Sequence, residues 1–330
     1  MKIIIGFIIF CLVLFFYLHI YFHLKTSDDM EIYEIEAPSK DKIEEICDMR
    51  QPFVFPFNNE HLLQSCNRNT IGKLYGAFDV KIRSLNRELE DDEEIYLPIS
   101  YSNAVKAIDI DNESKYLIEN NSDFLQETGL IKQYKENDEY LRPSMVSNCM
   151  YDIIIASKGA QTVFKYDVNY RNYLYVTEGS VKIKLTPPKN SKYLSEIKDY
   201  ENFEFRSLIN PWDIQDKYKV DFDKVNCLDI NVTEGNMIFI PAYWWYSIEF
   251  GEKTTICSLK YRTYMNTFAI LPKLCMFVLQ SQNTKHKTLP QIQYDNKVVD
   301  NKVVDNKVVD NKVVDNKNKN DKVLNESHNK

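Results

Sequence analysis

The second half of this chain is divided into short apolar or alternating runs, and this pattern limits its possible folds more than any other feature. The runs are four to eight residues long. Runs of this length and period predict β-strands. Eight of them in one region favour a double-stranded β-helix, a jelly-roll in which two sheets pack face to face. They cover residues 153–156, 162–166, 173–176, 181–185, 227–232, 237–240, 246–250 and 254–261.

Helices are expected to flank the strands. Residues 39–49 begin with a serine and continue with apolar spacing, which predicts a capped amphipathic helix. Residues 116–134 are also expected to hold helix. Residues 266–280 predict a closing helix with a break at Pro272, because proline disrupts a helix interior. The acidic run at residues 88–94 predicts a solvated loop.

Composition supports one large domain with appendages. The chain has 330 residues, of which 44% are hydrophobic, including 22 Tyr and 18 Phe, enough for a sizeable core. The net charge is −7 and the pI is near 5.4. A broad basic surface for phosphate backbones is therefore not expected, so nucleic acid is not a predicted partner.

The amino terminus carries a membrane signal. Residues 3–22 have no formal charge and are rich in Ile, Phe and Leu, and this length matches a helix that crosses a bilayer. No small-x-small cleavage site follows, which favours a retained single-pass anchor over residues 1–25 rather than a signal peptide. Lysines lie on both sides of the run, so the side of the membrane on which the domain lies stays open.

The carboxyl terminus differs in kind. The pentapeptide Asp-Asn-Lys-Val-Val repeats four times over residues 295–314, a period too short and polar for a structural repeat. Residues 285–330 are therefore predicted to be a disordered low-complexity tail. The six cysteines outside the anchor include no Cys-x-x-Cys pair, which disfavours zinc and a dense disulfide framework.

Two motifs resemble a known family. The first is Thr-Val-Phe-Lys-Tyr-Asp at residues 162–167, followed by Asn172, Gly179 and Leu-Thr-Pro-Pro at residues 185–188. The second is the apolar run of residues 237–245, which ends in Ile-Pro-Ala-Tyr-Trp-Trp. Together they are similar to the JmjC and asparaginyl-hydroxylase-like branch of the cupin superfamily over residues 31–275. The resemblance implies a mainly β, jelly-roll domain with flanking helices, which we place at residues 31–280.

The resemblance also implies where iron would bind. Family members hold Fe(II) with His-x-Asp on one strand and a distant His on another; here these positions are Lys165, Asp167 and Tyr246. A triad rebuilt from His61 and His286 would need histidines from outside the motifs. We therefore expect no metal and no cofactor, and Fe(II) with 2-oxoglutarate only if the ligands are atypical.

The substituted positions suggest two arrangements. Lys165 and Asp167 are two apart on a predicted strand and should share a face. The first hypothesis is a Lys165–Asp167 ion pair, capped by the Tyr246 hydroxyl, at the former metal position. The second is that Lys165 turns to solvent.

The family's cosubstrate lysine is also replaced, here by Val181. Strand alternation predicts that Val181 points inward while Lys182 and Lys184 point outward. A pocket that accepts a small anion is still conceivable. Its candidate residues, in addition to the three metal positions, are Thr162, Asn172, Trp245, Lys260 and Arg262, with Trp245 also fitting a packing role.

These features lead to a functional prediction with an alternative. The prediction is a membrane-anchored, cupin-like binding or structural module without oxygenase activity, whose ligand is an unknown protein or a small anion. The alternative is an Fe(II)/2-oxoglutarate-dependent protein hydroxylase or demethylase-like oxygenase with atypical ligands. A third hypothesis is metal-independent chemistry with Lys165 as a base or nucleophile of depressed pKa.

Overall fold

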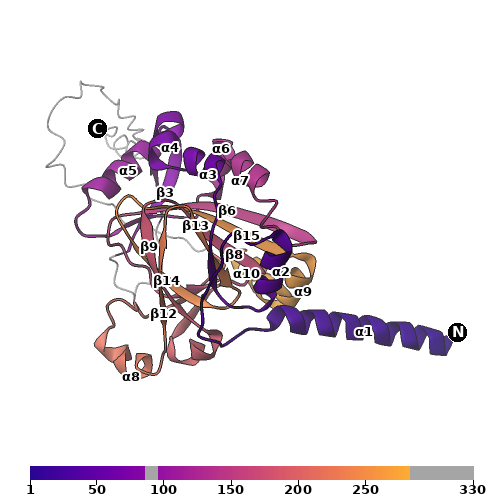
Figure 1. The fold of residues 1–330 in the computed structure, drawn as a ribbon. Coiled ribbons are helices and arrows are strands. Elements are labelled where there is room, and N and C mark those ends of the chain that lie inside the picture. The colour runs from indigo at the N-terminus through magenta and orange to yellow at the C-terminus, as the bar shows by residue number, and fades with distance from the viewer. Residues whose placement is uncertain (86–95, 283–330) are drawn as a thin grey trace, which may run out of the picture. The chain divides into compact units, whose positions relative to one another are not determined.

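Two β-sheets pack against each other in this computed structural model, which describes residues 1–85 and 96–282. Figure 1 shows the sheets with helices around them. The mainly β fold with flanking helices is confirmed. The predicted acidic loop at residues 88–94 and the predicted tail at residues 285–330 lie outside the described residues.

The two sheets contain all of the predicted runs. Each of the eight runs includes a strand. The hairpin of β10 (Glu196–Asp199) and β11 (Glu204–Ser207) was not predicted, because its segments are short and three of the four residues in each are polar. The nine-stranded sheet has the order β1 (Tyr33–Glu34), β2 (Phe53–Pro56), β13 (Asn236–Pro241), β8 (Arg171–Glu178), β15 (Thr255–Thr263), β6 (Val146–Ala156), β5 (Tyr116–Ile118), β3 (Asp79–Ser84) and β4 (Leu97–Ser100). The six-stranded sheet has the order β10 (Glu196–Asp199), β11 (Glu204–Ser207), β7 (Lys165–Tyr166), β14 (Trp245–Phe250), β9 (Ser180–Thr186) and β12 (Leu228–Thr233).

Strand alternation divides the apolar side chains between two cores. Leu174 and Val176 of β8 join the cluster between the sheets, whereas Tyr173 and Tyr175 join the cluster beneath the helices. Val181 of β9 is buried in the inner cluster, as its position in the strand predicts. Both faces of β8 are thus buried, as expected for a strand near the middle of a covered sheet.

Helices cover the outer face of the nine-stranded sheet (Figure 1). The predicted helix at residues 39–49 is confirmed, because the Ser39 side chain accepts a hydrogen bond from the backbone N–H of Lys42 at 3.2 Å. Residues 116–134 begin with a strand and then hold helix. The covering helices are α2 (Lys40–Asp48), α3 (Glu60–Ser65), α4 (Arg68–Tyr75), α5 (Tyr101–Ile110), α6 (Ser122–Glu127) and α7 (Ile131–Asn137).

The closing segment is two helices, α9 (Tyr264–Ala269) and α10 (Leu271–Ser281). The predicted break is present, but it lies at Ile270. Pro272 occupies the first turn of α10, where its missing N–H leaves no hydrogen bond unmade. The remaining short elements are α8 (Lys219–Phe222) and two 3₁₀ helices, Pro188–Tyr193 and Asp216–Tyr218.

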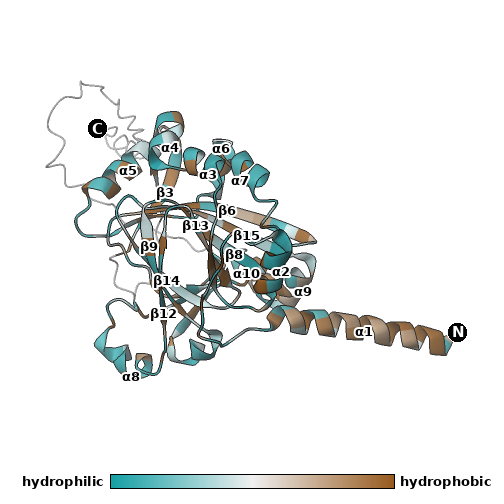
Figure 2. Cartoon of the chain, in the orientation of Figure 1, coloured by the Kyte–Doolittle hydropathy of each residue, from teal (hydrophilic) through white to brown (hydrophobic). Residues whose placement is uncertain are grey.

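The first helix, α1 (Lys2–Leu24), is long and apolar enough to cross a membrane by its length and composition. Figure 2 colours it hydrophobic along its length. The most apolar stretch of this helix is not buried by the rest of the chain.

Two glycines at strand ends have similar backbone conformations but different amounts of space around them. Gly179 and Gly235 both have a positive φ, 77° and 82°. A Cβ on Gly179 would lie 2.7 Å from the carbonyl oxygen of Glu252, whereas a Cβ on Gly235 meets nothing within 4 Å. Gly235→Ala should therefore cost only the backbone strain of about 1–2 kcal/mol. Gly179→Ala should cost more, measured as a lower urea midpoint; equal losses in the two variants would contradict this packing.

Candidate functional site

A cavity of about 590 Å³ opens between the two sheets. Strands β3, β6 and β15 and the segment that follows β5 border it on one side, and β7, β11 and β14 border it on the other. Six cationic side chains and four carboxylates line it, a formal excess of two positive charges. The cations are Lys81, Arg83, Lys165, Arg206, Lys260 and Arg262, and the carboxylates are Glu119, Asp152, Asp167 and Glu204.

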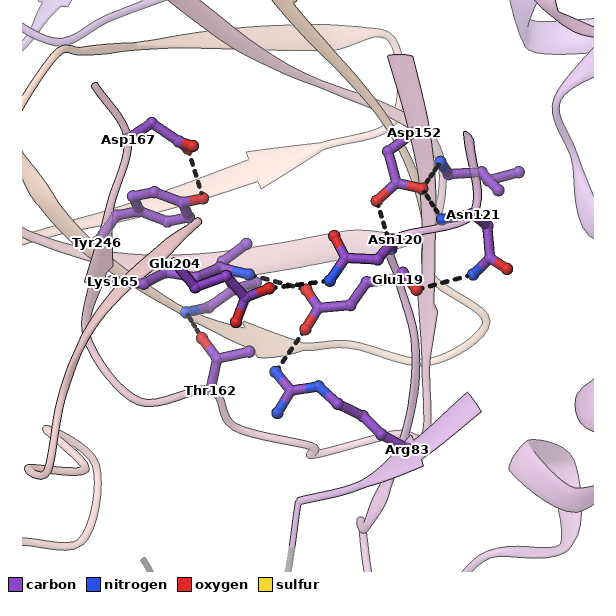
Figure 3. A network of polar contacts seen from close by, with 12 residues as sticks. Arg83, Glu119, Asn120, Asn121, Asp152, Thr162, Lys165, Asp167, Glu204 and Tyr246 are labelled. Atoms are coloured by element: carbon purple, nitrogen blue, oxygen red, sulfur yellow. Dashed lines mark hydrogen bonds and ion pairs between the residues drawn. The ribbon is translucent and has the colours of Figure 1, made fainter. Parts of the chain in front are cut away.

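Glu119, which follows β5, is the centre of the first ion-pair group in this cavity. It is 3% exposed. Its Oε2 lies 2.8 Å from Lys165 Nζ, and its Oε1 accepts from the Arg83 guanidinium (Figure 3). Burial opposes ionisation of Glu119, but Arg83 and Lys165 outweigh burial and lower its pKa to about 2. Glu119 is therefore an ionised carboxylate shared by two cations.

Both sequence hypotheses for Lys165 are wrong. Its ammonium does not pair with Asp167, and the side chain does not turn to solvent. It extends from β7 to Glu119, which follows a strand of the opposite sheet. Burial lowers the pKa of Lys165, but the charges of Glu119 and Glu204 outweigh burial, and the pKa is raised. The amine is thus protonated at neutral pH. The hypothesis of a lysine base with depressed pKa is not supported by this environment.

Asp167, just beyond β7, has a different cation as its partner. Lys260 Nζ lies 2.8 Å from Asp167 Oδ1, and the Tyr246 hydroxyl donates to Asp167 Oδ2 at 3.0 Å. The contact of Tyr246 with Asp167 matches the sequence prediction, whereas Lys260 takes the place predicted for Lys165. Burial and Asp167 raise the pKa of Tyr246 far above its usual value, so the phenol stays a hydrogen-bond donor.

Asp152 of β6 supports the segment that carries Glu119. Its carboxylate accepts the backbone N–H of Asn120 at 2.8 Å and of Asn121 at 2.7 Å. Figure 3 shows Asp152 on the far side of Glu119 from Lys165. Burial raises the pKa of Asp152 to about 6, against the opposing effect of these hydrogen bonds. These contacts fix the backbone directly after Glu119.

These donors do not fit Fe(II). A facial iron site takes two imidazoles and a carboxylate, but here an ammonium and a protonated phenol flank a carboxylate already bound by Lys260. An ammonium has no lone pair to offer a metal. Within residues 1–85 and 96–282, no group of three His, Cys, Asp or Glu side chains could hold a metal. His61 is exposed on α3, and His286 lies outside the described residues.

The other predicted pocket residues divide into two groups. Thr162, Lys260 and Arg262 line the cavity. Asn172 and Trp245 do not, so their assignment to the pocket was wrong. The Asn172 amide donates to backbone carbonyls, including that of Ile240 at 3.1 Å, and the Trp245 indole N–H donates to a serine hydroxyl at 2.7 Å within an aromatic cluster. The donor groups of both residues thus bind partners within the protein.

Strand β15 presents Ser258, Lys260 and Arg262 at alternate positions on its cavity face, and the last two are among the predicted pocket residues. The Arg262 guanidinium donates to Asn169 Oδ1 at 2.9 and 3.2 Å, and in the described part of the chain it has no carboxylate within 4.0 Å. The Ser258 hydroxyl is buried without a hydrogen-bond partner there. Both groups therefore keep hydrogen-bond donor capacity on the cavity face of β15.

Ser258 and Glu119 were not predicted as site residues. The alternation that selects Lys260 and Arg262 also selects Ser258, two residues earlier on the strand. Glu119 has no such local signal, because it is 46 residues from Lys165 in sequence.

Comparison with known proteins agrees with this fold. The family model of the cupin-like domain matches residues 34–265, and the chain therefore belongs to the cupin-like domain family. No curated protein sequence matches the chain. The family match agrees with the fold. The likeness to the hydroxylase-like branch comes from the motifs alone.

Glu119→Gln should make stability depend on pH in a defined way. A carboxylate with a lowered pKa in the folded state stabilises the fold above its unfolded pKa of about 4.5 and loses this effect as the pH falls toward 2. The variant should lose roughly 2–4 kcal/mol of unfolding free energy at neutral pH, because two cations lose their counter-charge. This difference from wild type should shrink below about pH 4.

The matched control is Glu113→Gln, which removes an exposed carboxylate paired with Lys115 at 2.8 Å. Exposed pairs contribute about 0–1 kcal/mol, so this variant should resemble wild type. Denaturant unfolding across pH measures both variants. A Glu119→Gln effect that stays constant from neutral to acidic pH would contradict the ionised, shared carboxylate.

Proposed function

We propose that this protein is a membrane-anchored, cupin-like binding module that takes a small anionic ligand and does not perform oxygenase chemistry. The observation that supports this most is the cation content of the former metal position. Lys165 and Lys260 place two ammonium groups beside Glu119 and Asp167, where related enzymes are expected to hold a metal ion.

Electrostatics argue against a divalent cation in this position. The two carboxylates that could attract a metal already have lysine partners at 2.8 Å. Lys165 and Lys260 are half-buried. Separating either ammonium from its carboxylate to admit a metal would leave a partly desolvated charge without a partner, which is unfavourable. The lysines thus supply the positive charge that a metal would otherwise bring.

The same charges suit an anion. Arg262 has a neutral hydrogen-bond partner, Asn169, and its guanidinium lies 5.6 Å from the Phe203 ring centre. An arginine with free donor capacity beside an aromatic ring is typical of sites for carboxylates or phosphates. The cavity volume of about 590 Å³ is within the range of small-molecule sites. The proposed ligand is therefore a small carboxylate or phosphate compound.

Anchoring is the second part of the proposal. The 23 residues of α1 extend about 34 Å at 1.5 Å per residue, and a hydrocarbon core is about 30 Å thick. The lack of a small-x-small cleavage site after this helix supports retention. The domain would then be held at the surface of one membrane.

Restoring the histidines tests the iron part of the proposal. Lys165→His with Tyr246→His supplies two imidazoles, and adding Lys260→Ala frees the Asp167 carboxylate. Anaerobic Fe(II) affinity should therefore rise from wild type to the double variant and again to the triple variant. A wild-type protein that binds Fe(II) as tightly as the triple variant would show that it forms an iron site by other ligands, as an oxygenase would require.

Thermal stability tests the anion part. Succinate or phosphate should raise the melting temperature of the full chain in detergent, because a ligand that binds the native state stabilises it. Arg262→Gln should lose most of this rise. Lys158→Gln, which removes an exposed charge outside the cavity lining, should keep it. Equal responses of the two variants and wild type would place the effect outside the cavity.

A further inference from the structure

The outward face of α9 and α10 is apolar, whereas a helix face that meets water is usually polar. In these two helices the most exposed positions hold no charged residue. Ser281, the last residue of α10, is exposed and polar. The exposed apolar residues are Tyr264, Phe268, Leu271, Pro272, Cys275, Met276, Val278 and Leu279. We call these residues the α9–α10 face. Contiguous exposed apolar surface of this kind marks a contact with a membrane or another protein.

The one basic residue of these helices points inward. Lys273 of α10 has its ammonium 4.6 Å from the ring centre of Phe205 and 5.1 Å from that of Tyr243. Burial lowers the pKa of Lys273. A water-facing helix would place such a side chain outside. The helix instead turns its charge toward the protein and its apolar residues away from it.

The α9–α10 face is continuous with α1. The rings of Phe16 in α1 and Phe268 in α9 are 5.7 Å apart, and Figure 1 shows α9 beside the domain end of α1. Phe16 is eight residues before Leu24, about 12 Å along the helix axis. If α1 crosses a bilayer, Phe268 must therefore lie close to the hydrocarbon core.

Polar contacts fix α1 to the domain at this end. His23 Nε2 lies 3.3 Å from the hydroxyl oxygen of Thr263, the residue that caps α9. The Arg50 guanidinium lies 5.2 Å from the ring centre of Phe22 and 4.6 Å from that of Tyr170. These contacts hold α9 next to the end of α1, so an anchored α1 brings the α9–α10 face to the bilayer.

We propose that the α9–α10 face inserts into the acyl and headgroup boundary of the same bilayer that α1 crosses. This inference rests on the proposed anchor. Apolar helix faces enter this boundary by roughly 5–10 Å, a depth that matches contact between Phe268 and the outer third of α1. The domain would then be held by one spanning helix and one interfacial surface, with a fixed orientation.

Tryptophan reporters in the full chain test this proposal. Phe268→Trp and Leu279→Trp place a probe on the α9–α10 face, Leu74→Trp places one on exposed α4, and Phe10→Trp places one within α1. Each variant is reconstituted in neutral phosphatidylcholine vesicles with or without brominated acyl chains, and the parent signal is subtracted. The lipid bromines should remove most of the added fluorescence at positions 268 and 279, and leave that at position 74 unchanged.

Phe10→Trp separates the two proposals. A quenched probe at position 10 beside unquenched probes at positions 268 and 279 would overturn the interfacial contact and leave the anchor in place. Unquenched probes at all three positions, 10, 268 and 279, would overturn both the interfacial contact and the anchor. Unquenched face probes together with a dimeric mass in detergent would assign the face to a second copy of the chain, which also overturns the lipid contact.

Discussion

Two lysine–carboxylate pairs balance the charge of the cavity in this cupin-like domain. Lys165 holds Glu119, and Lys260 holds Asp167, each at 2.8 Å. Arg83 and the Tyr246 hydroxyl complete the hydrogen bonding of the two carboxylates. Buried charges persist only when they are paired and hydrogen-bonded, and both carboxylates meet this condition without a metal.

The pairs also connect the two sheets. Glu119 follows β5 of the nine-stranded sheet, whereas Lys165 lies in β7 of the six-stranded sheet. Lys260 of β15 reaches Asp167 at the end of β7 in the opposite direction. The cavity is thus spanned by ion pairs that join its two walls. Among its remaining positive groups, Arg262 is the one to which we assign the proposed anion.

Much of the fold follows from periodicity, but the partner of Lys165 does not. The alternating runs that became β8, β9 and β15 carry their burial pattern in the sequence, and Pro272 indicates the break before α10. The Lys165–Asp167 pair was predicted from strand alternation, yet β7 ends at Tyr166 and that alternation does not extend to Asp167. Glu119 is placed by the pairing of β5 with β6, a long-range contact with no local signal.

The site residues also divide into those that local spacing predicts and those that it does not. Lys260 and Arg262 were found because their spacing places them on one strand face. Asn172 and Trp245 were assigned to the pocket by resemblance, but the Asn172 amide nitrogen donates to backbone carbonyls and the Trp245 indole N–H donates to a serine hydroxyl. Motif position therefore predicted where these residues lie along the strands. The hydrogen bonds around them determine whether their polar groups are available to the cavity.

Metal analysis of the purified wild-type chain, after anaerobic incubation with excess Fe(II) and removal of free ions, tests the central claim most directly. The paired lysines predict far less than one iron per chain. One tightly held iron per chain, lost on substitution of Asp167→Ala, would show that this carboxylate binds the metal and would contradict its pairing with Lys260 as the occupant of the former metal position.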